Sequence, residues 1–135
     1  MSLSVAARRA RLLAVRDLVL SSGDGALWLL DGPMAPNPTA AISGTPLAIV
    51  ALDLAAFTLH ETDATLVISA VGNAATSGLP TWARFLDGVG VGVLDVTAGP
   101  AGSGAQAIVA DIENPASGQI WTGGQLTVTL TWVEG

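Results

Sequence analysis

Hydrophobic and polar residues alternate most regularly near the end of the chain. Apolar residues at every second position from Leu126 to Trp132 are separated by three threonines. A period of two residues places one set of side chains on each face of a β-strand, and β-branched threonine suits the strand conformation. The segment is therefore predicted to be a half-buried strand.

Further apolar runs of strand length lie between turn-forming residues, which predicts further strands. These runs cover residues 26–31, 47–54, 64–71 and 105–112. The segment 34–46 contains three prolines and is predicted to be a loop, because proline cannot donate a backbone hydrogen bond. No element is assigned to residues 55–63.

The stretch from Leu79 to Val96 predicts a β-hairpin, because β-favouring residues flank the sequence Asp87-Gly88-Val89-Gly90. Glycine allows a tight reversal there. An isolated hairpin is not stable in water, so the other strands must pair with it and cover its apolar side. With about seven or eight strands, the predicted fold is mainly β: an antiparallel β-sandwich, jelly-roll-like, preceded by an N-terminal α-helix.

The predicted helix runs from Ser4, its expected N-cap, to Leu20. We therefore divide the chain into an N-terminal helical arm, residues 1–22, and a β-sandwich domain, residues 23–135. The helix carries four arginines: Arg8, Arg9, Arg11 and Arg16. They are spread around its circumference, so three interpretations stay open: packing on its own domain, docking on an acidic neighbouring subunit, or contact with nucleic acid.

Half of the 135 residues are hydrophobic and only 12% are charged. Soluble domains average about 25% charged residues, so other subunits are expected to cover part of this exterior. Every apolar run is shorter than the roughly 18 residues of a membrane span, which predicts no membrane partner. The apolar run after Arg11 is broken at Arg16 and Asp17, and no export signal is expected.

The formal net charge of −6 is unevenly distributed. Residues 1–16 carry four positive charges, whereas residues 17–135 contain Arg84 and all eleven acidic residues. Nucleic-acid binding depends on neutralising phosphates, so the acidic body argues against a nucleic-acid partner. Any such contact would have to involve the N-terminal segment.

Candidate chemistry is sparse. His60, the only histidine, is close to Glu61 and Asp63 and is interpreted as a surface histidine in preference to a metal ligand or general base. The glycines after Asp87 do not have the Gly-x-Gly-x-x-Gly spacing of a dinucleotide site, and a strand follows them where a helix is needed. There is no cysteine and no nucleophile motif. The sequence therefore predicts neither an enzyme nor a cofactor.

Two other residue types, aspartate and tryptophan, are site candidates. Asp87, Asp95 and Asp111 would need to converge to bind calcium, and they lack EF-hand spacing. The tryptophans are open to three interpretations, namely core packing, subunit contact and stacking on sugars. They are Trp28, Trp82, Trp121 and Trp132.

Several short motifs together suggest a family. The helix leads into Leu27-Trp28-Leu29-Leu30-Asp31-Gly32-Pro33, and later come Thr81-Trp82-Ala83-Arg84-Phe85-Leu86-Asp87-Gly88, Gly102-Ser103-Gly104-Ala105 and Gly123-Gly124-Gln125-Leu126-Thr127-Val128-Thr129. In this layout the chain resembles small β-sandwich proteins encoded among the structural genes of tailed bacteriophages and prophages. The resemblance spans nearly the whole chain.

The resemblance implies a non-enzymatic virion protein, above all a cement or decoration protein on the capsid surface, made in the cytoplasm of the host bacterium. Its expected partners are copies of itself, as a dimer or trimer, and the major capsid protein. The four N-terminal arginines would make electrostatic contacts, with Trp28 or Trp82 as anchors. The alternative is a tail, fibre or receptor-binding module that binds carbohydrate.

Overall fold

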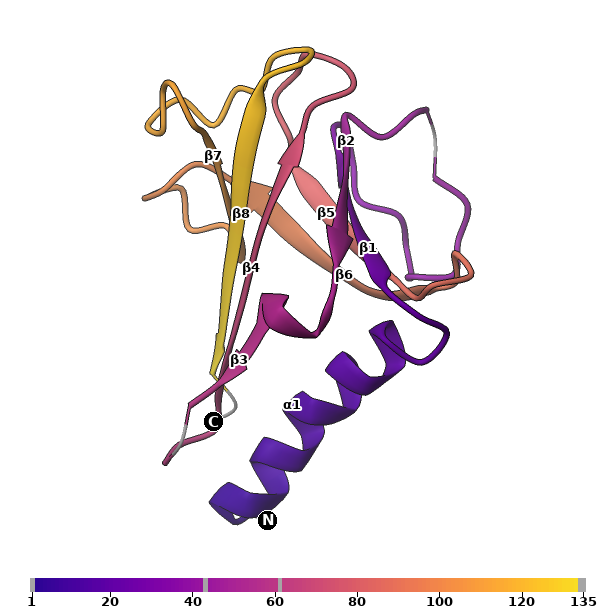
Figure 1. Cartoon of the computed structure of the whole chain (residues 1–135), viewed down its shortest axis with the longest axis vertical. Helices are drawn as coiled ribbons and strands as arrows, with labels where there is room; N and C mark the ends of the chain where they lie inside the picture. Colours follow the sequence, from indigo (N-terminus) through magenta and orange to yellow (C-terminus); the bar gives the residue numbers. More distant parts are fainter. Residues whose placement is uncertain (1, 43, 61, 134–135) are drawn as a thin grey trace.

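The computed structural model describes residues 2–42, 44–60 and 62–133, and within them one helix precedes eight strands (Figure 1). The elements are α1 (Val5–Val19), β1 (Gly25–Leu30), β2 (Ala48–Leu52), the short 3-10 helix η1 (Leu54–Ala56), β3 (Phe57–Leu59), β4 (Thr65–Asn73), β5 (Trp82–Leu86), β6 (Gly92–Gly99), β7 (Ala107–Asp111) and β8 (Gln125–Val133). The mainly β class with an N-terminal helix is confirmed.

The strands form one curled sheet in the order β2-β1-β5-β6-β7-β8-β4-β3. All neighbours pair antiparallel except β6 and β7, which are parallel over two residue pairs, Ala98 with Ala107 and Gly99 with Ile108. The prediction that all strands pair antiparallel is therefore wrong for β6 and β7. An isolated bridge between Ala48 and Ala74 brings β2 next to the residues that follow β4. A two-sheet, jelly-roll-like sandwich stays a prediction, since the hydrogen-bonded sheet is continuous.

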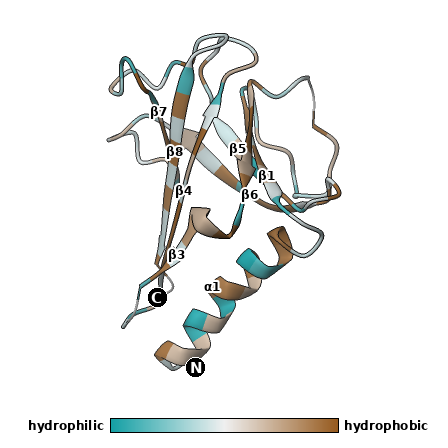
Figure 2. Ribbon diagram, viewed as in Figure 1, coloured by the Kyte–Doolittle hydropathy of each residue, from teal (hydrophilic) through white to brown (hydrophobic). Residues whose placement is uncertain are grey.

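The core lies on the concave side of the sheet and follows the alternation of the sequence. In β8 the buried residues Leu126, Val128 and Leu130 alternate with less buried threonines, which confirms the predicted strand. The edge strand β2 alternates in the same way, with buried residues at positions 48, 50 and 52. Figure 2 shows brown, hydrophobic segments alternating with paler ones along β8.

Helix α1 packs on the same core. Its N-cap is Ser4, whose Oγ accepts a hydrogen bond from the backbone N–H of Ala7 at 3.1 Å, as the sequence predicts. Leu12 and Val19, which are two turns apart, are fully buried and belong to the cluster formed by the strands. Packing on its own domain is thus the interpretation that the structure favours. No helix in the described ranges is long and apolar enough to cross a membrane.

The predicted hairpin is present as β5 and β6, and the side chain of Asp87 organises its turn. Asp87 Oδ1 accepts hydrogen bonds from the backbone N–H groups of Val89 and Val91, at 3.1 and 2.9 Å. Gly90 has φ +89°, a conformation that costs glycine little. The turn brings the start of β6 close to the loop that joins β1 and β2.

Candidate contact surface

One row of residues crosses four strands on the outer face of the sheet. Ile49 on β2 lies opposite Trp28 on β1, Trp28 lies opposite Arg84 on β5, and Arg84 lies opposite Asp95 on β6. Directly opposite residues in a sheet point to the same face. The row is therefore apolar at its β2 end and charged at its β6 end.

The charged end is a buried ion pair. Arg84 Nε and Nη2 donate to the two carboxylate oxygens of Asp95 at 2.8 and 3.1 Å, and both side chains are only 5% exposed. The guanidinium also lies over the ring of Trp82, with its carbon 5.3 Å from the ring centroid. The two charges therefore compensate each other where little water reaches them.

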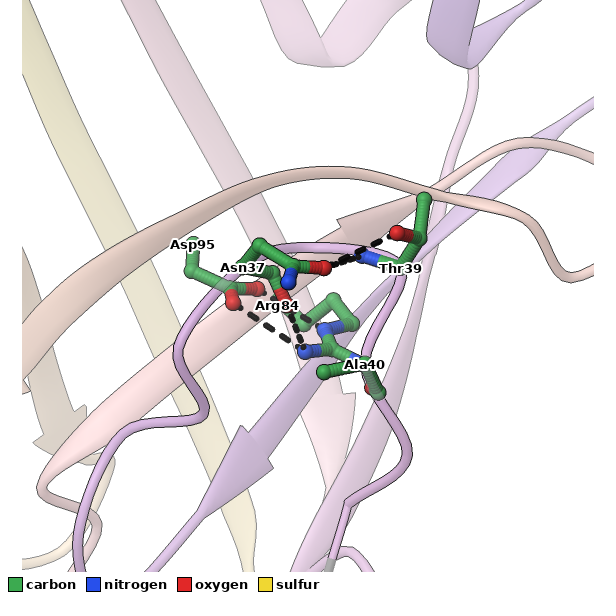
Figure 3. Close-up of polar contacts among 5 residues, drawn as sticks. All are labelled: Asn37, Thr39, Ala40, Arg84 and Asp95. Atoms are coloured by element: carbon green, nitrogen blue, oxygen red, sulfur yellow. Dashed lines mark hydrogen bonds and ion pairs between the residues drawn. The ribbon is translucent and has the colours of Figure 1, made fainter.

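Arg84 also fastens the long loop between β1 and β2. Its Nη1 donates to the carbonyl oxygen of Ala40 at 2.6 Å and its Nη2 to that of Asn37 at 3.0 Å. Within the loop, the Asn37 side chain accepts hydrogen bonds from the N–H and hydroxyl of Thr39, so the bend is fixed locally (Figure 3). The proline-rich segment is thus held against the outer face of the sheet although it contains no strand.

A hollow of about 380 Å³ lies where this loop meets the sheet and the turn before β6. Among the described residues that line it, Arg84 alone is charged, and Asp95 compensates this charge. Trp28, Ile42 and Val91 line the hollow, and Ile49, which is 56% exposed, lies beside Trp28. We call Trp28, Ile42, Ile49 and Val91 the outer-face patch. A neutral apolar surface of this kind suits contact with another protein.

The two tryptophans expected to anchor a partner have different positions. Trp28 is half-buried within the outer-face patch. Trp82 is only 3% exposed, and its Nε1 donates to the carbonyl oxygen of Asp31 at 3.2 Å. Trp82 thus packs inside the protein, and the outer-face patch does not include it.

The four N-terminal arginines have different surroundings. Arg9 Nη1 donates to the carbonyl oxygens of His60 and Asp63, at 2.8 Å for Asp63, and so ties α1 to the turn between β3 and β4. Arg16 pairs with Asp17 at 2.9 Å on the surface. Arg11 is exposed, whereas the Nε of the half-buried Arg8 is enclosed with no hydrogen-bond partner among the described residues.

The acidic candidates do not converge. His60 Nδ1 lies 3.2 Å from Asp63 Oδ1 at the surface, and Glu61 lies outside the described residues. Asp111 accepts hydrogen bonds from the N–H groups of Glu113 and Asn114 and thereby forms a turn, just as Asp87 does in its own turn. In the described part of the chain, no three acidic or histidine side chains are grouped to hold a metal ion.

The remaining tryptophans flank other hollows. Trp121 is 57% exposed beside a hollow of about 250 Å³ that Glu113 and Gln125 also line. Trp132 is half-buried and lies near the C-terminal end of β8, whereas Gln125 is at the start of that strand. An exposed indole next to polar side chains can stack on a sugar ring or pack against a protein surface.

Sequence reasoning missed the part that Arg84 plays, because its loop acceptors are backbone carbonyls, which leave no signature in the sequence. One signal was present: Arg84 and Asp95 are opposite charges on either side of a glycine turn in an otherwise apolar hairpin. Such a pair predicts a cross-strand contact.

Comparison with known proteins gave no match to a family model, a curated protein or a solved structure. The resemblance to phage structural proteins rests on the sequence motifs alone.

Proposed function

We propose that this chain is a non-enzymatic structural protein of a bacteriophage virion, a capsid cement or decoration protein that self-associates and staples neighbouring major capsid subunits. The observation that carries the proposal is the outer-face patch. The patch exposes apolar side chains beside a loop that Arg84 anchors to the sheet. Asp95 compensates the charge of Arg84.

The construction of this patch fits a lasting contact. The Arg84 network holds the loop in place, so little conformational freedom is left to lose on association. Ile49 and Val91 are exposed where burial in an interface would remove them from water. The patch therefore suits contact with a second copy of the chain.

The N-terminal helix offers a second contact of different chemistry. Arg11 is exposed on α1, in the positively charged segment of an otherwise acidic chain. In the proposed assembly, this end of the protein faces acidic groups of the neighbouring shell subunits. The outer-face patch joins copies of the chain, and the helix grips the shell.

Light scattering of the purified protein over a range of concentrations tests the self-association. We expect a dimer or trimer for the natural chain and a monomer for Ile49→Asp, because a charge would be buried in the interface. Leu18→Asp is the matched control, since Leu18 is 57% exposed on α1, away from the patch, and its variant should still associate.

Co-sedimentation with capsids that lack this protein tests the shell contact. Capsids of the phage that encodes it should pellet the natural chain, and binding should weaken as salt is raised. A chain that stays monomeric at high concentration and does not pellet with these capsids would overturn the proposal.

Trp121 favours one other function, a carbohydrate-binding module of the tail or fibre. Its exposed ring beside Glu113 and Gln125 could stack on a sugar. Titration with host surface glycans should then quench the tryptophan fluorescence, and Trp121→Ala should abolish the change. A flat titration excludes this alternative for the glycans tested.

A further inference from the structure

The hollow beside Trp121 carries negative charge without a cation to balance it. Of the described residues that line this Trp121 hollow, two are acidic and none is basic: Asp111, Ile112, Glu113, Trp121, Gly124 and Gln125. The ion pairs between described residues all lie elsewhere. Figure 1 shows α1 at the lower end of the molecule and the loop between β7 and β8 at the upper end. The helical arginines of the same copy therefore lie far from the hollow.

Asp111 is the buried acid of this hollow. It is the last residue of β7 and only 6% exposed. Its Oδ2 accepts hydrogen bonds from the N–H groups of Glu113 and Asn114, at 3.1 and 3.0 Å. No described residue donates a hydrogen bond to Oδ1, and a Cβ atom at Gly124 would lie only 3.5 Å from it. A buried carboxylate oxygen that lacks a donor is costly, so this position favours a ligand with N–H groups.

Trp121 supplies an aromatic face to the same hollow. The residue is 57% exposed. The face of an indole ring attracts cations, and a planar guanidinium can stack on it while its N–H groups meet a carboxylate. Glu113 and Gln125, which are both exposed, add further hydrogen-bond acceptors at the rim. The hollow therefore combines an aromatic surface with acceptors for a cation.

The protein already holds a guanidinium in surroundings of this kind. Arg84 lies over the ring of Trp82 and donates two hydrogen bonds to the carboxylate of Asp95. The Trp121 hollow offers the same two groups, an indole ring and a buried carboxylate, without the cation. Its volume is about 250 Å³. Pockets for drug-sized ligands hold about 300–1,000 Å³, so the Trp121 hollow suits a single functional group.

We propose that the Trp121 hollow binds a guanidinium group, the side-chain chemistry of arginine. The bound group lies on the ring of Trp121 and donates to Oδ1 of Asp111, and Glu113 attracts it from the rim. A neutral sugar can stack on the same ring but leaves the two carboxylates without a counter-charge. The inference goes beyond the proposed function, because the hollow shares no residue with the outer-face patch.

Titration of the nitrogen-15-labelled protein with N-acetyl-arginine amide, followed by NMR chemical shifts, tests the site. We expect saturable shifts at the indole N–H of Trp121 and at backbone amides between residues 111 and 125, with a millimolar dissociation constant. N-acetyl-citrulline amide has nearly the same shape and no charge, and should bind at least about tenfold more weakly. Equal affinities for the two compounds, or no shifts at tens of millimolar, would overturn the proposal.

Two variants each remove one of the carboxylates. Asp111→Asn keeps an acceptor for the turn and should weaken binding of the arginine compound about tenfold. Glu113→Gln changes an exposed side chain that the fold does not need, and should weaken binding about threefold. Asp24→Asn is the matched control, because it removes one charge beside a different hollow and should bind as the natural chain does. Equal affinities for all three variants contradict the proposal.

Free arginine distinguishes the two sources of the guanidinium, a small molecule and an arginine side chain of another protein. Free arginine carries the charged amino and carboxylate groups that a side chain within a protein lacks. Tighter binding of free arginine than of the blocked compound indicates a small-molecule ligand, and equal or weaker binding indicates a protein side chain. Displacement of the blocked compound by a neutral host glycan would assign Trp121 to carbohydrate binding and overturn the inference.

Discussion

Arg84 on β5 and Asp95 on β6 lie opposite each other and form a bidentate ion pair, with both side chains only 5% exposed. Burying either charge alone would cost several kcal/mol, and the pair avoids this because every nitrogen of the guanidinium donates a hydrogen bond. The same guanidinium binds two carbonyl oxygens of the loop that shapes the outer-face patch. The pair therefore links the hairpin to the surface that we propose for self-association.

Removing one partner of this pair should be strongly destabilising. Asp95→Asn leaves the guanidinium of Arg84 buried without a counter-charge, and we expect the free energy of unfolding to fall by about 3–5 kcal/mol. Urea denaturation followed by tryptophan fluorescence measures the change. Asp17→Asn is the control, because Asp17 pairs with Arg16 on the surface. This substitution should lower the free energy of unfolding by less than about 1 kcal/mol. Equal losses for the two variants would contradict this account.

Removing both partners should separate stability from loop anchoring. In the double variant Arg84→Met with Asp95→Leu no buried charge is left, so we expect it to be more stable than Asp95→Asn. The carbonyl oxygens of Asn37 and Ala40 nevertheless lose their donor. Limited proteolysis should then cut between residues 34 and 46 faster than in the natural chain. An unchanged cleavage rate would show that other contacts hold the loop.

The buried face of α1 should contribute to global stability. Leu12→Ala leaves a cavity between the helix and the sheet, and a fully buried leucine truncated in this way typically costs about 2–5 kcal/mol. Leu18→Ala on the exposed side should stay within about 0.5 kcal/mol. Thermal denaturation followed by circular dichroism compares the two. Similar melting temperatures would mean that the helix is not part of the cooperative unit.

Local patterns predicted the strands and the helix because their signals lie within the elements. The alternation from Leu126 to Trp132 is a property of β8 itself, and Ser4 marks the start of α1 without help from the rest of the chain. The three-residue strand β3 is too short to show a period, and no element was assigned there. The parallel joint between β6 and β7 depends on the path of the chain in space, which the period of a strand does not encode.

The contact surface was predicted only in part, for the same reason. Trp28 was singled out by its residue type, and its position in the outer-face patch is compatible with that choice. Ile49 looked like one more apolar residue in a buried run, because only the register with β1 shows that it points outward. Asp95 was weighed as a calcium ligand, although its counter-charge lies on the neighbouring strand. Long-range partners decide each of these cases.

Gly92 provides a test of how closely the loop approaches the sheet. A Cβ atom at this position would lie 1.8 Å from the carbonyl oxygen of Pro38, so Gly92→Ala must push the loop away from β6. We expect faster hydrogen exchange in residues 36–42 and weaker self-association by light scattering. Gly102→Ala is the control, because its Cβ would meet open space and only its φ of +83° disfavours alanine. The variant should lose some stability and keep the loop in place. Identical exchange in the two variants would mean that the loop does not rest on Gly92.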